Sequence, residues 1–386
     1  MSNDDARRTL RTRLRSQGLS GPRAPAVEAV AERLVGVQAQ ELAFARLAFR
    51  PRCSRAVVAA DVDAALRERT LIWTWTMRGT LHLVRAADAG WLIGLLGPIF
   101  AARGRPRRLA LGLDDARCER AVVQLREMLA ADGPQTRAAL AARLPIDVGG
   151  QAPAHLLAYA AMRGVICRAP SLEGREPTYV LLEDWIGAPP AAVAEDDALA
   201  LLGRRYLAGH GPAAAADLAA WSGIGLRRAR RALEGVAAAP AAAPGPARVS
   251  DSRGVALLGH FDPYLLGYAS REPVLDARYA KRIQAGGGFV APAVLVDGRV
   301  VGTWRRDGDD WLEPFEALGG NVLRRSRMSA PTWRDTWPPR PSGRARAAAQ
   351  SGITIRSTCE HVFVTRNLRS ERGDRRGPGQ RLATAA

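Results

Sequence analysis

Apolar residues recur at helical spacing in two stretches of the middle of the chain, 117–131 and 197–208. The segments that follow them, "LAADGPQTRAALAA" (129–142) and "LAGHGPAAAADLAA" (207–220), match at eight of fourteen positions. Further helical patterns come next in each copy, and then strand-like runs such as "TYVLLED" and "GVALLGH". Helix, turn, helix, helix and a two-stranded wing is the order of a winged helix-turn-helix. The repeat therefore predicts two such modules, over 113–190 and 191–259.

The regions on either side of the repeat carry different patterns. Residues 1–112 contain three helical stretches followed by "LIWTWTMRG" and "TLHLV", whose alternation predicts a β-hairpin and hence a third, looser module. After residue 259 the pattern changes to short strands, and Asp297-Gly298 between alternating runs predicts a type I′ hairpin. Residues 260–318 are therefore expected to form a small β-barrel-like domain. The predicted fold class is α+β, with tandem winged-helix modules followed by this domain.

Residues 319–386 lose both helical and strand periodicity and become rich in Arg, Pro, Gly and Ser, which favours a disordered tail. A second hypothesis is a shift of reading frame near residue 320. Back-translation of "TWRDTWP" in the neighbouring frame permits the helix-like sequence "ADVARHLAA". The genomic DNA distinguishes the two, because early stop codons in the shifted frame would exclude it.

The net charge of +18 favours a polyanionic partner such as nucleic acid. Residues 321–386 hold fourteen arginines and four acidic residues, so more than half of the excess lies in the tail. The chain has one lysine among its basic residues, so the arginine excess also fits a GC-rich genome. No window approaches eighteen uncharged apolar residues and the N-terminus lacks a signal-peptide pattern, so we expect a cytoplasmic protein with no membrane partner. Four cysteines without a CxxC pair are expected to be reduced thiols rather than zinc ligands or disulfides.

The common catalytic signatures are missing: the sequence has no HExxH, no P-loop and no GxSxG. His82 lies in the alternating run "TLHLV" and is expected to be a strand histidine rather than a metal ligand. The segment "RLVGVQAQE" (33–41) stands out because Gln38 and Gln40 are two residues apart in apolar surroundings. On an ideal helix their side chains would point about 200° apart, so they can share one pocket only where the backbone is extended. The alternative is a helix in which one glutamine is exposed and the other is hydrogen bonded.

Four motifs in this order, "RLVGVQAQE", "TWTMRGTLHLV", "FDPYLLGY" and "VLVDGRVVGTW", resemble the winged-helix DNA glycosylases that unhook interstrand crosslinks, the AlkZ/YcaQ type. The resemblance covers about residues 7–318, and the tail departs from the family pattern. It implies tandem modules that cradle double-stranded DNA in a basic channel, a C-terminal β-barrel, and catalysis by a Gln-apolar-Gln motif, here Gln38 and Gln40. The sequence fits the branch with Gln in both polar positions rather than the branch that ends in Asp.

The implied reaction is hydrolysis of the N-glycosidic bond of cationic N7-alkylguanine, including bulky adducts and interstrand crosslinks. Two amides suffice to position a water against a base that its lesion has already activated, so we expect no metal or organic cofactor. With no lysine near the motif for a Schiff base, a strand-cleaving lyase step is not expected. Glu41 is the nearest carboxylate and a weaker candidate for a helper. Such an enzyme could serve general DNA repair, or self-resistance to an alkylating antibiotic.

DNA contacts are predicted from basic residues and from the resemblance. Arg78 and Tyr264 match family motifs and are expected to line the channel, whereas Asp262 could equally cap a turn. Two arginine clusters are candidates for phosphate contacts, or for solvated basic faces: Arg227, Arg228, Arg230 and Arg231 on the predicted recognition helix, and Arg103, Arg105, Arg107 and Arg108 in a predicted linker. The rival interpretation is a non-catalytic winged-helix regulator. The absence of an obvious dimerisation helix counts against it, and we expect a monomer.

Overall fold

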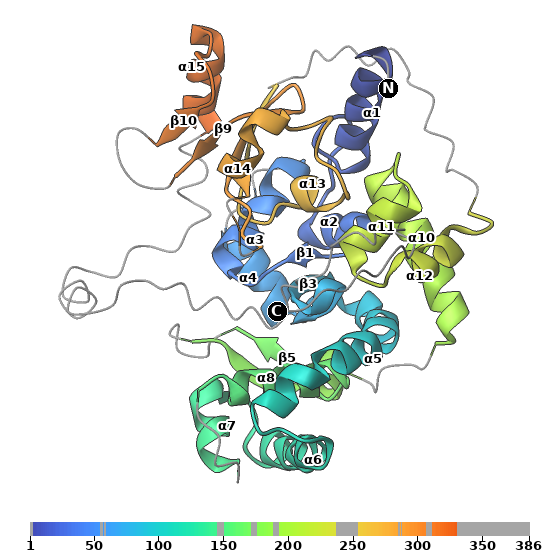
Figure 1. The fold of residues 1–386 in the computed structure, drawn as a ribbon. Coiled ribbons are helices and arrows are strands. Elements are labelled where there is room, and N and C mark those ends of the chain that lie inside the picture. The colour runs from blue at the N-terminus through green and yellow to red at the C-terminus, as the bar shows by residue number, and fades with distance from the viewer. Residues whose placement is uncertain are drawn as a thin grey trace, which may run out of the picture.

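The structure is a computed structural model that describes residues 3–54, 57, 59–144, 150–170, 176–187, 193–236, 254–284, 286, 288–305 and 311–329. Helices and strands are mixed along the chain, which confirms the α+β class. The helices α6, α7 and α8 lie at one end of the molecule and the strands β9 and β10 at the other, with β1 and β3 between them (Figure 1). None of the helices within these ranges is both long and apolar enough to cross a membrane.

The N-terminal region contains the predicted hairpin and more helix than the sequence suggested. Its elements are α1 (Asn3–Ser16), α2 (Val27–Leu34), β1 (Val37–Gln38), α3 (Leu42–Phe49), the 3-10 turn η1 (Arg50–Arg52), α4 (Ala59–Arg67), β2 (Leu71–Trp75), η2 (Met77–Gly79), β3 (Leu81–Arg85) and α5 (Ala86–Ala110). The strands β2 and β3 pair antiparallel, as predicted. The two-residue strand β1 pairs with the other edge of β3, which brings the segment of the two glutamines into the sheet.

The second region follows the predicted order of elements. They are α6 (Asp115–Asp132), β4 (Gln135–Thr136), α7 (Arg137–Arg143), α8 (Ala152–Met162), β5 (Ile166–Ala169), β6 (Thr178–Leu181) and α9 (Leu182–Ile186). The strands of the first and second regions also pair with each other, since Trp73 of β2 pairs with Arg168 of β5. One six-stranded sheet, in the order β1-β3-β2-β5-β6-β4, therefore crosses the predicted boundary at 112/113.

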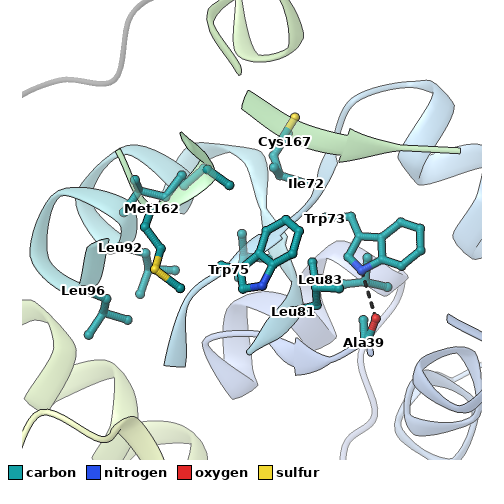
Figure 2. Packing of buried hydrophobic residues seen from close by; sticks show 14 of the residues in the cluster. Ala39, Ile72, Trp73, Trp75, Leu81, Leu83, Leu92, Leu96, Met162 and Cys167 are labelled. Atoms are coloured by element: carbon teal, nitrogen blue, oxygen red, sulfur yellow. Dashed lines mark hydrogen bonds between the residues drawn. The ribbon is translucent and has the colours of Figure 1, made fainter. Parts of the chain in front are cut away.

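The main core covers this shared sheet. Trp75, Leu92, Leu96 and Met162 pack together beside β2 (Figure 2), and all four are buried. Helix α5 runs through Pro106 to Ala110, so the predicted linker at 103–108 is wrong: the segment is helical. The helix packs closely on α8, since a Cβ added at Gly97 would lie 2.0 Å from the carbonyl oxygen of Met162.

The third region contains the three predicted helices, α10 (Glu195–His210), α11 (Ala215–Ser222) and α12 (Leu226–Leu233). Helix α10 also packs tightly on the end of α2, because a Cβ at Gly209 would lie 1.8 Å from the carbonyl oxygen of Arg33. The predicted two-stranded wing of this region is wrong for its second strand. Its first strand, at 247–251, lies outside the described residues, and its second is β7 (Val255–Leu258), which pairs with β8 (Ala293–Val296) of the C-terminal sheet.

The C-terminal sheet has four antiparallel strands in the order β10-β9-β8-β7, with β9 at Arg299–Trp304 and β10 at Leu312–Pro314. Its helical elements are α13 (Pro263–Leu266), η4 (Ala277–Tyr279) and α14 (Ala280–Ile283). The predicted hairpin is confirmed, since Val296 pairs with Arg299 and both turn residues have positive φ, 48° at Asp297 and 82° at Gly298. The predicted barrel is wrong: within the described residues β7 and β10 do not pair, and the sheet is open.

Helix α3 joins the glutamine segment to this second sheet. Leu47 of α3 is buried in a cluster with Val255, Val294 and Trp304. The helix α15 (Gly320–Ser329) contacts β7 and places Val322 against the same cluster. The expectation that helical structure ends at 319 is therefore wrong for these ten residues. The rest of the predicted tail, 330–386, lies outside the described residues.

Candidate active site

The glutamine segment begins where α2 ends abruptly. Val35 caps the helix in the left-handed region (φ 60°, ψ 17°), which is rare for a β-branched residue, and Gly36 follows with φ 124°. Glycine is needed there for space as well, since a Cβ would lie 2.9 Å from Val84 Cγ1 and 3.3 Å from the carbonyl oxygen of Leu83. A non-glycine residue held in such a conformation marks a place where the surrounding structure dictates the backbone.

The backbone that follows is extended, as the spacing of the glutamines predicted. Val37 pairs with Leu83 and Gln38 with His82, and Ala39 N donates to Leu81 O at 2.7 Å. Gln38 Nε2 donates a short hydrogen bond to Gln40 Oε1. The two amides therefore meet on the same side of the strand, with Gln38 buried and Gln40 half-buried. The shared geometry is confirmed, and the alternative of a continuous helix is wrong.

Ala39, between the two glutamines, is held from the opposite side. Its side chain is fully buried, and its carbonyl oxygen accepts from Trp73 Nε1 at 2.9 Å (Figure 2). The Trp73 ring lies under the guanidinium of Arg168, 4.5 Å from its centroid. Since a buried carbonyl without a donor costs about 1–3 kcal/mol, this bond fixes the strand that carries both amides. The sequence did not single out Trp73, although the alternation of "LIWTW" places Trp73 and Trp75 on one face of β2.

Arg78 is the charged group that contacts the pair. It lies in the loop between β2 and β3 with left-handed backbone (φ 57°, ψ 13°). Its guanidinium donates short hydrogen bonds to Gln38 Oε1 and to the carbonyl oxygen of Trp221. Burial, with help from the charge of Arg271, lowers the pKa of Arg78 to about 10. The predicted channel residue is thus in direct contact with Gln38.

His82 belongs to a polar row across three strands, with Gln38 on one side and Thr74 on the other. Its Nδ1 lies 2.9 Å from the carbonyl oxygen of Thr80, which can only accept, so Nδ1 carries the proton and Nε2 keeps its lone pair. Burial, assisted by the charge of Arg78, lowers the pKa of His82 to about 3. The imidazole is therefore a neutral acceptor beside Gln38 at any ordinary pH.

Glu41 does not join the amides. It is exposed and serves as the first residue before α3, whose Phe44 N and Ala45 N donate to its carbonyl oxygen. Partial desolvation by its surroundings raises the pKa of the Glu41 carboxyl. No described bond connects this carboxyl with Gln38 or Gln40.

The motif "FDPYLLGY" is structural. Tyr264 is 1% exposed and its hydroxyl donates to Gly298 O at 3.1 Å, so the prediction that it contacts DNA is wrong. Asp262 does cap the turn, accepting from Tyr264 N at 2.9 Å, as the turn interpretation proposed. It also accepts both Nη groups of the fully buried Arg52, at 2.7 and 2.9 Å. The sequence offered no signal for this ion pair, which joins residues 210 positions apart.

The arginines of the predicted recognition helix divide into two pairs. In α12, Arg228 Nε lies 2.8 Å from Glu195, and Arg231 Nη2 lies 2.5 Å from Asp196, both at the start of α10. Arg227 and Arg230 are exposed and make no ion pair with the described residues. In this helix, only Arg227 and Arg230 can therefore contact phosphates without first breaking an ion pair.

The other basic cluster, in α5, is largely occupied by protein. Arg105 pairs with Asp115, and Arg107 Nη2 donates to Gln151 Oε1 at 2.7 Å. Arg108 is buried, 4.2 Å from the ring centroid of Tyr159, and cannot contact DNA. Arg103 is exposed but donates to Gly223 O at 2.9 Å. This cluster is a weaker candidate for phosphate contacts than α12.

Comparison with known proteins identifies the family of this chain. The sequence model of a family described as "DNA glycosylase AlkZ-like" matches residues 31–320. A curated relative, the interstrand DNA cross-link repair glycosylase of Streptomyces sahachiroi, is 30% identical over 327 residues, which cover 76% of this chain and 85% of the relative. A solved structure, the Streptomyces sahachiroi DNA glycosylase AlkZ, superposes with a TM-score of 0.71 and 26% identity, covering 86% of this chain and 98% of that one.

These matches define the class of protein: the chain is a DNA glycosylase. It belongs to the AlkZ-like family of these enzymes, because the family match extends over most of its length. The rival interpretation, a non-catalytic regulator, is wrong.

Proposed function

We propose that this glycosylase hydrolyses the N-glycosidic bond of cationic N7-alkylguanine in double-stranded DNA, including bulky adducts and interstrand crosslinks. The observation that carries the proposal is the meeting of the Gln38 and Gln40 amides on an extended strand. The cross-link repair glycosylase to which the chain is similar supports the choice of substrate.

The two amides suit a substrate that is already activated. An alkylated N7 gives the guanine a positive charge, so the base leaves without a strong general acid, and what remains is to place a water against the anomeric carbon. Gln40 Oε1 accepts one bond from Gln38 and has a second lone pair that can accept from that water. Arg78 holds Gln38 Oε1 and so sets the orientation of the first amide.

The remaining parts of the proposal concern DNA. We infer that the repeated helical regions act as winged-helix modules around the duplex, with Arg78, Arg227 and Arg230 contacting phosphates. The chain acts as a monomer, because both glutamines and Arg78 come from one polypeptide. The reaction stops at the abasic site, since neither amide can form a Schiff base.

The test uses purified protein with two duplexes, one carrying N7-methylguanine and one carrying an interstrand crosslink between N7 positions. Gln38→Ala and Gln40→Ala should each lower the rate of base release by about 10²–10³-fold, the usual cost of removing one positioned polar group from an active site. Duplex binding should be retained. Gln151→Ala is the matched control, because this exposed glutamine bonds Arg107 outside the site.

Two results would contradict the proposal. Base release at the wild-type rate by both glutamine variants would remove these residues from the mechanism. Release of ordinary uncharged purines as fast as N7-methylguanine would remove the argument from an activated substrate.

A further inference from the structure

Arg78, which contacts Gln38, interacts electrostatically with Arg271, although the two arginines come from distant parts of the chain. Arg78 lies between β2 and β3, and Arg271 follows α13 in the C-terminal region. Arg271 is half-buried, with Nε donating to Leu265 O at 2.8 Å and Nη1 to Gln284 Oε1 at 2.6 Å. The acceptors of Arg78 are likewise the neutral oxygens of Gln38 and Trp221. Each guanidinium thus uses two of its five N–H groups, on neutral partners, within the described residues.

Several other half-buried arginines of this protein are paired with carboxylates, whereas Arg168 lies over the rings of Trp73 and Tyr179. Arg46 lies 2.5 Å from Asp63, and Arg85 and Arg205 share Glu32 and Asp88. Within the described parts of the chain, no carboxylate comes within ion-pair distance of Arg78 or Arg271. These two charges therefore lack the carboxylate partners that Arg46, Arg85 and Arg205 have.

The effect of the uncompensated charge reaches neighbouring groups. Arg271 adds to burial in lowering the pKa of Arg78, and Arg78 adds to burial in lowering the pKa of His82. Desolvation also lowers the pKa of Arg271 itself. Cationic groups that repel one another in partly dry surroundings destabilise a protein unless an anion joins them.

Helix α11 holds both arginine segments in place. The carbonyl oxygen of Trp221, near its end, accepts from Arg78. Asp217, near its start, accepts from Ala269 N at 2.9 Å, two residues before Arg271. Tyr268, the residue before Ala269, donates its hydroxyl to His210 O at 2.9 Å, at the end of α10. The arrangement is preorganised, so little further ordering is needed for a ligand to bind.

The chemistry of the substrate identifies the anion. In the proposed function the damaged base is cationic and the transition state resembles an oxocarbenium ion, so neither can be the partner of two guanidinium groups. The sugar-phosphate backbone beside the lesion is the anion that DNA brings to this place, and arginine is well suited to hold a phosphate.

We propose that Arg78 and Arg271 together bind one backbone phosphate next to the damaged nucleotide, so that the N-terminal and C-terminal regions close on the same phosphate. This rests on the proposed function for the position of the lesion beside Gln38. Binding the phosphate offsets the two positive charges before the cationic base departs, and it holds Arg78 where it orients Gln38.

The experiment compares wild-type protein with Arg271→Gln, which keeps a side chain able to donate to Leu265 O. Arg278→Gln is the matched control, because Arg278 lies in the same region, is exposed, and pairs with Asp276 and Glu316. The probe is a duplex with N7-methyl-2′-fluoro-deoxyguanosine, in which the fluorine slows base loss. Affinity is measured over a range of KCl concentrations, and again with single phosphates around the lesion replaced by neutral methylphosphonates.

We expect the slope of log affinity against log salt to become shallower by about 0.9 in Arg271→Gln, the value for one lost phosphate contact, and to stay unchanged in Arg278→Gln. One methylphosphonate position should weaken wild-type binding by about tenfold, in the range of a lost charge-assisted hydrogen bond, and should leave Arg271→Gln unaffected. Thermal unfolding of Arg271→Gln and of Arg271→Lys, which keeps the charge, checks that the fold is intact.

The outcomes separate this proposal from the proposed function. An unchanged salt slope, or equal sensitivity of wild type and a folded Arg271→Gln to every methylphosphonate, would overturn the phosphate site. If phosphate sensitivity follows Arg271 while the glutamine variants still release the base, the phosphate site stands and the catalytic assignment fails. Should Arg271→Gln not fold, wild type and Arg271→Lys are compared at the same methylphosphonates. The site is overturned if neutralising a phosphate weakens wild-type binding only at positions remote from the lesion.

Discussion

Arg52 and Arg78 occupy opposite kinds of surroundings, although both are arginines held inside the protein and both join separate regions of the chain. All five N–H groups of Arg52 have acceptors: Ala48 O, Gln17 O, Gln17 Oε1 and both oxygens of Asp262. Arg52 and Asp262 are both fully buried. Arg78 has two neutral acceptors and a second arginine, Arg271, near it.

The difference separates an arginine whose N–H groups are all bonded within the fold from one that keeps N–H groups for a ligand. Arg52 joins α1, α3 and α13 around one ion pair, and nothing remains for it to bind. Arg78 keeps positive charge and free N–H groups beside Gln38. The predictions below test this contrast by changing each side in turn.

Arg52→Met is expected to have the largest effect on stability, lowering the free energy of unfolding by about 3–5 kcal/mol. The reason is that the buried carboxylate of Asp262 would lose its partner. Urea unfolding measures the loss. Adding Asp262→Leu should recover part of it, because no buried charge then remains, and a double variant no more stable than Arg52→Met would show that the ion pair is not the cause.

Arg78→Met is expected to change activity more than stability. Base release from N7-methylguanine DNA under single-turnover conditions should fall by about 10²-fold, because Gln38 loses the donor that orients it. The free energy of unfolding should stay within about 1 kcal/mol of wild type, since removing an uncompensated charge offsets the lost hydrogen bonds. A loss of stability as large as that of Arg52→Met would erase the contrast between the two arginines.

Each arginine also influences a buried histidine, and this predicts the pH dependence of stability. Burial lowers the pKa of both His82 and His210 to about 3, assisted by Arg78 and by Arg52 respectively. Between the ordinary histidine pKa and the lowered one, the unfolded chain binds a proton that the folded chain does not. Stability should therefore fall as the pH drops below about 6.5, by up to about 1.4 kcal/mol per pH unit for each histidine.

The measurement is urea unfolding at pH 7 and pH 5. His210→Phe should reduce the pH dependence by the contribution of one proton, since His210 stacks on Tyr206 at a centroid distance of 4.8 Å and an aromatic ring can replace it there. An equal pH dependence in wild type and His210→Phe would mean that His210 titrates normally in the folded protein.

The smallest effect is expected on the surface, where α12 repeats the contrast between paired and unpaired arginines. The double variant Arg227→Gln/Arg230→Gln should weaken duplex binding and reduce the salt slope by up to about 2. Arg228→Gln/Arg231→Gln should change both much less, because Glu195 and Asp196 already occupy these side chains. Fluorescence anisotropy with undamaged duplex compares the two, and equal losses would show that the α10 carboxylates do not compete with DNA.

Local sequence patterns anticipated several elements of the site. The spacing of Gln38 and Gln40 required an extended backbone, and the alternation around Trp73 and Trp75 indicated a strand. In the C-terminal sheet, Asp297-Gly298 indicated the tight turn between β8 and β9. Each of these depends on neighbours in the chain, where side-chain direction and backbone preference act over a few residues.

Other elements depended on packing and were missed. Helix α5 continues past Pro106 although proline disfavours helix, and its close contact with α8 at Gly97 contributes to holding it. Strand β7 resembled a wing of the third module, but its pairing partner β8 lies about forty residues further along. Periodicity predicts a strand without naming the strand it pairs with, so the open four-stranded sheet could not be distinguished from a barrel.

The sequence by itself determined which chemistry the molecule carries: an amide pair held on an extended segment, surrounded by an excess of arginine. Only the tertiary structure decided which arginines are free to act. Arg52 and Asp262 are 210 residues apart, Arg78 and Arg271 nearly as far, and Tyr264 lies in the core despite its place in a family motif. The physical reason is that charge compensation and burial depend on distances in space, which the order of residues along the chain does not contain.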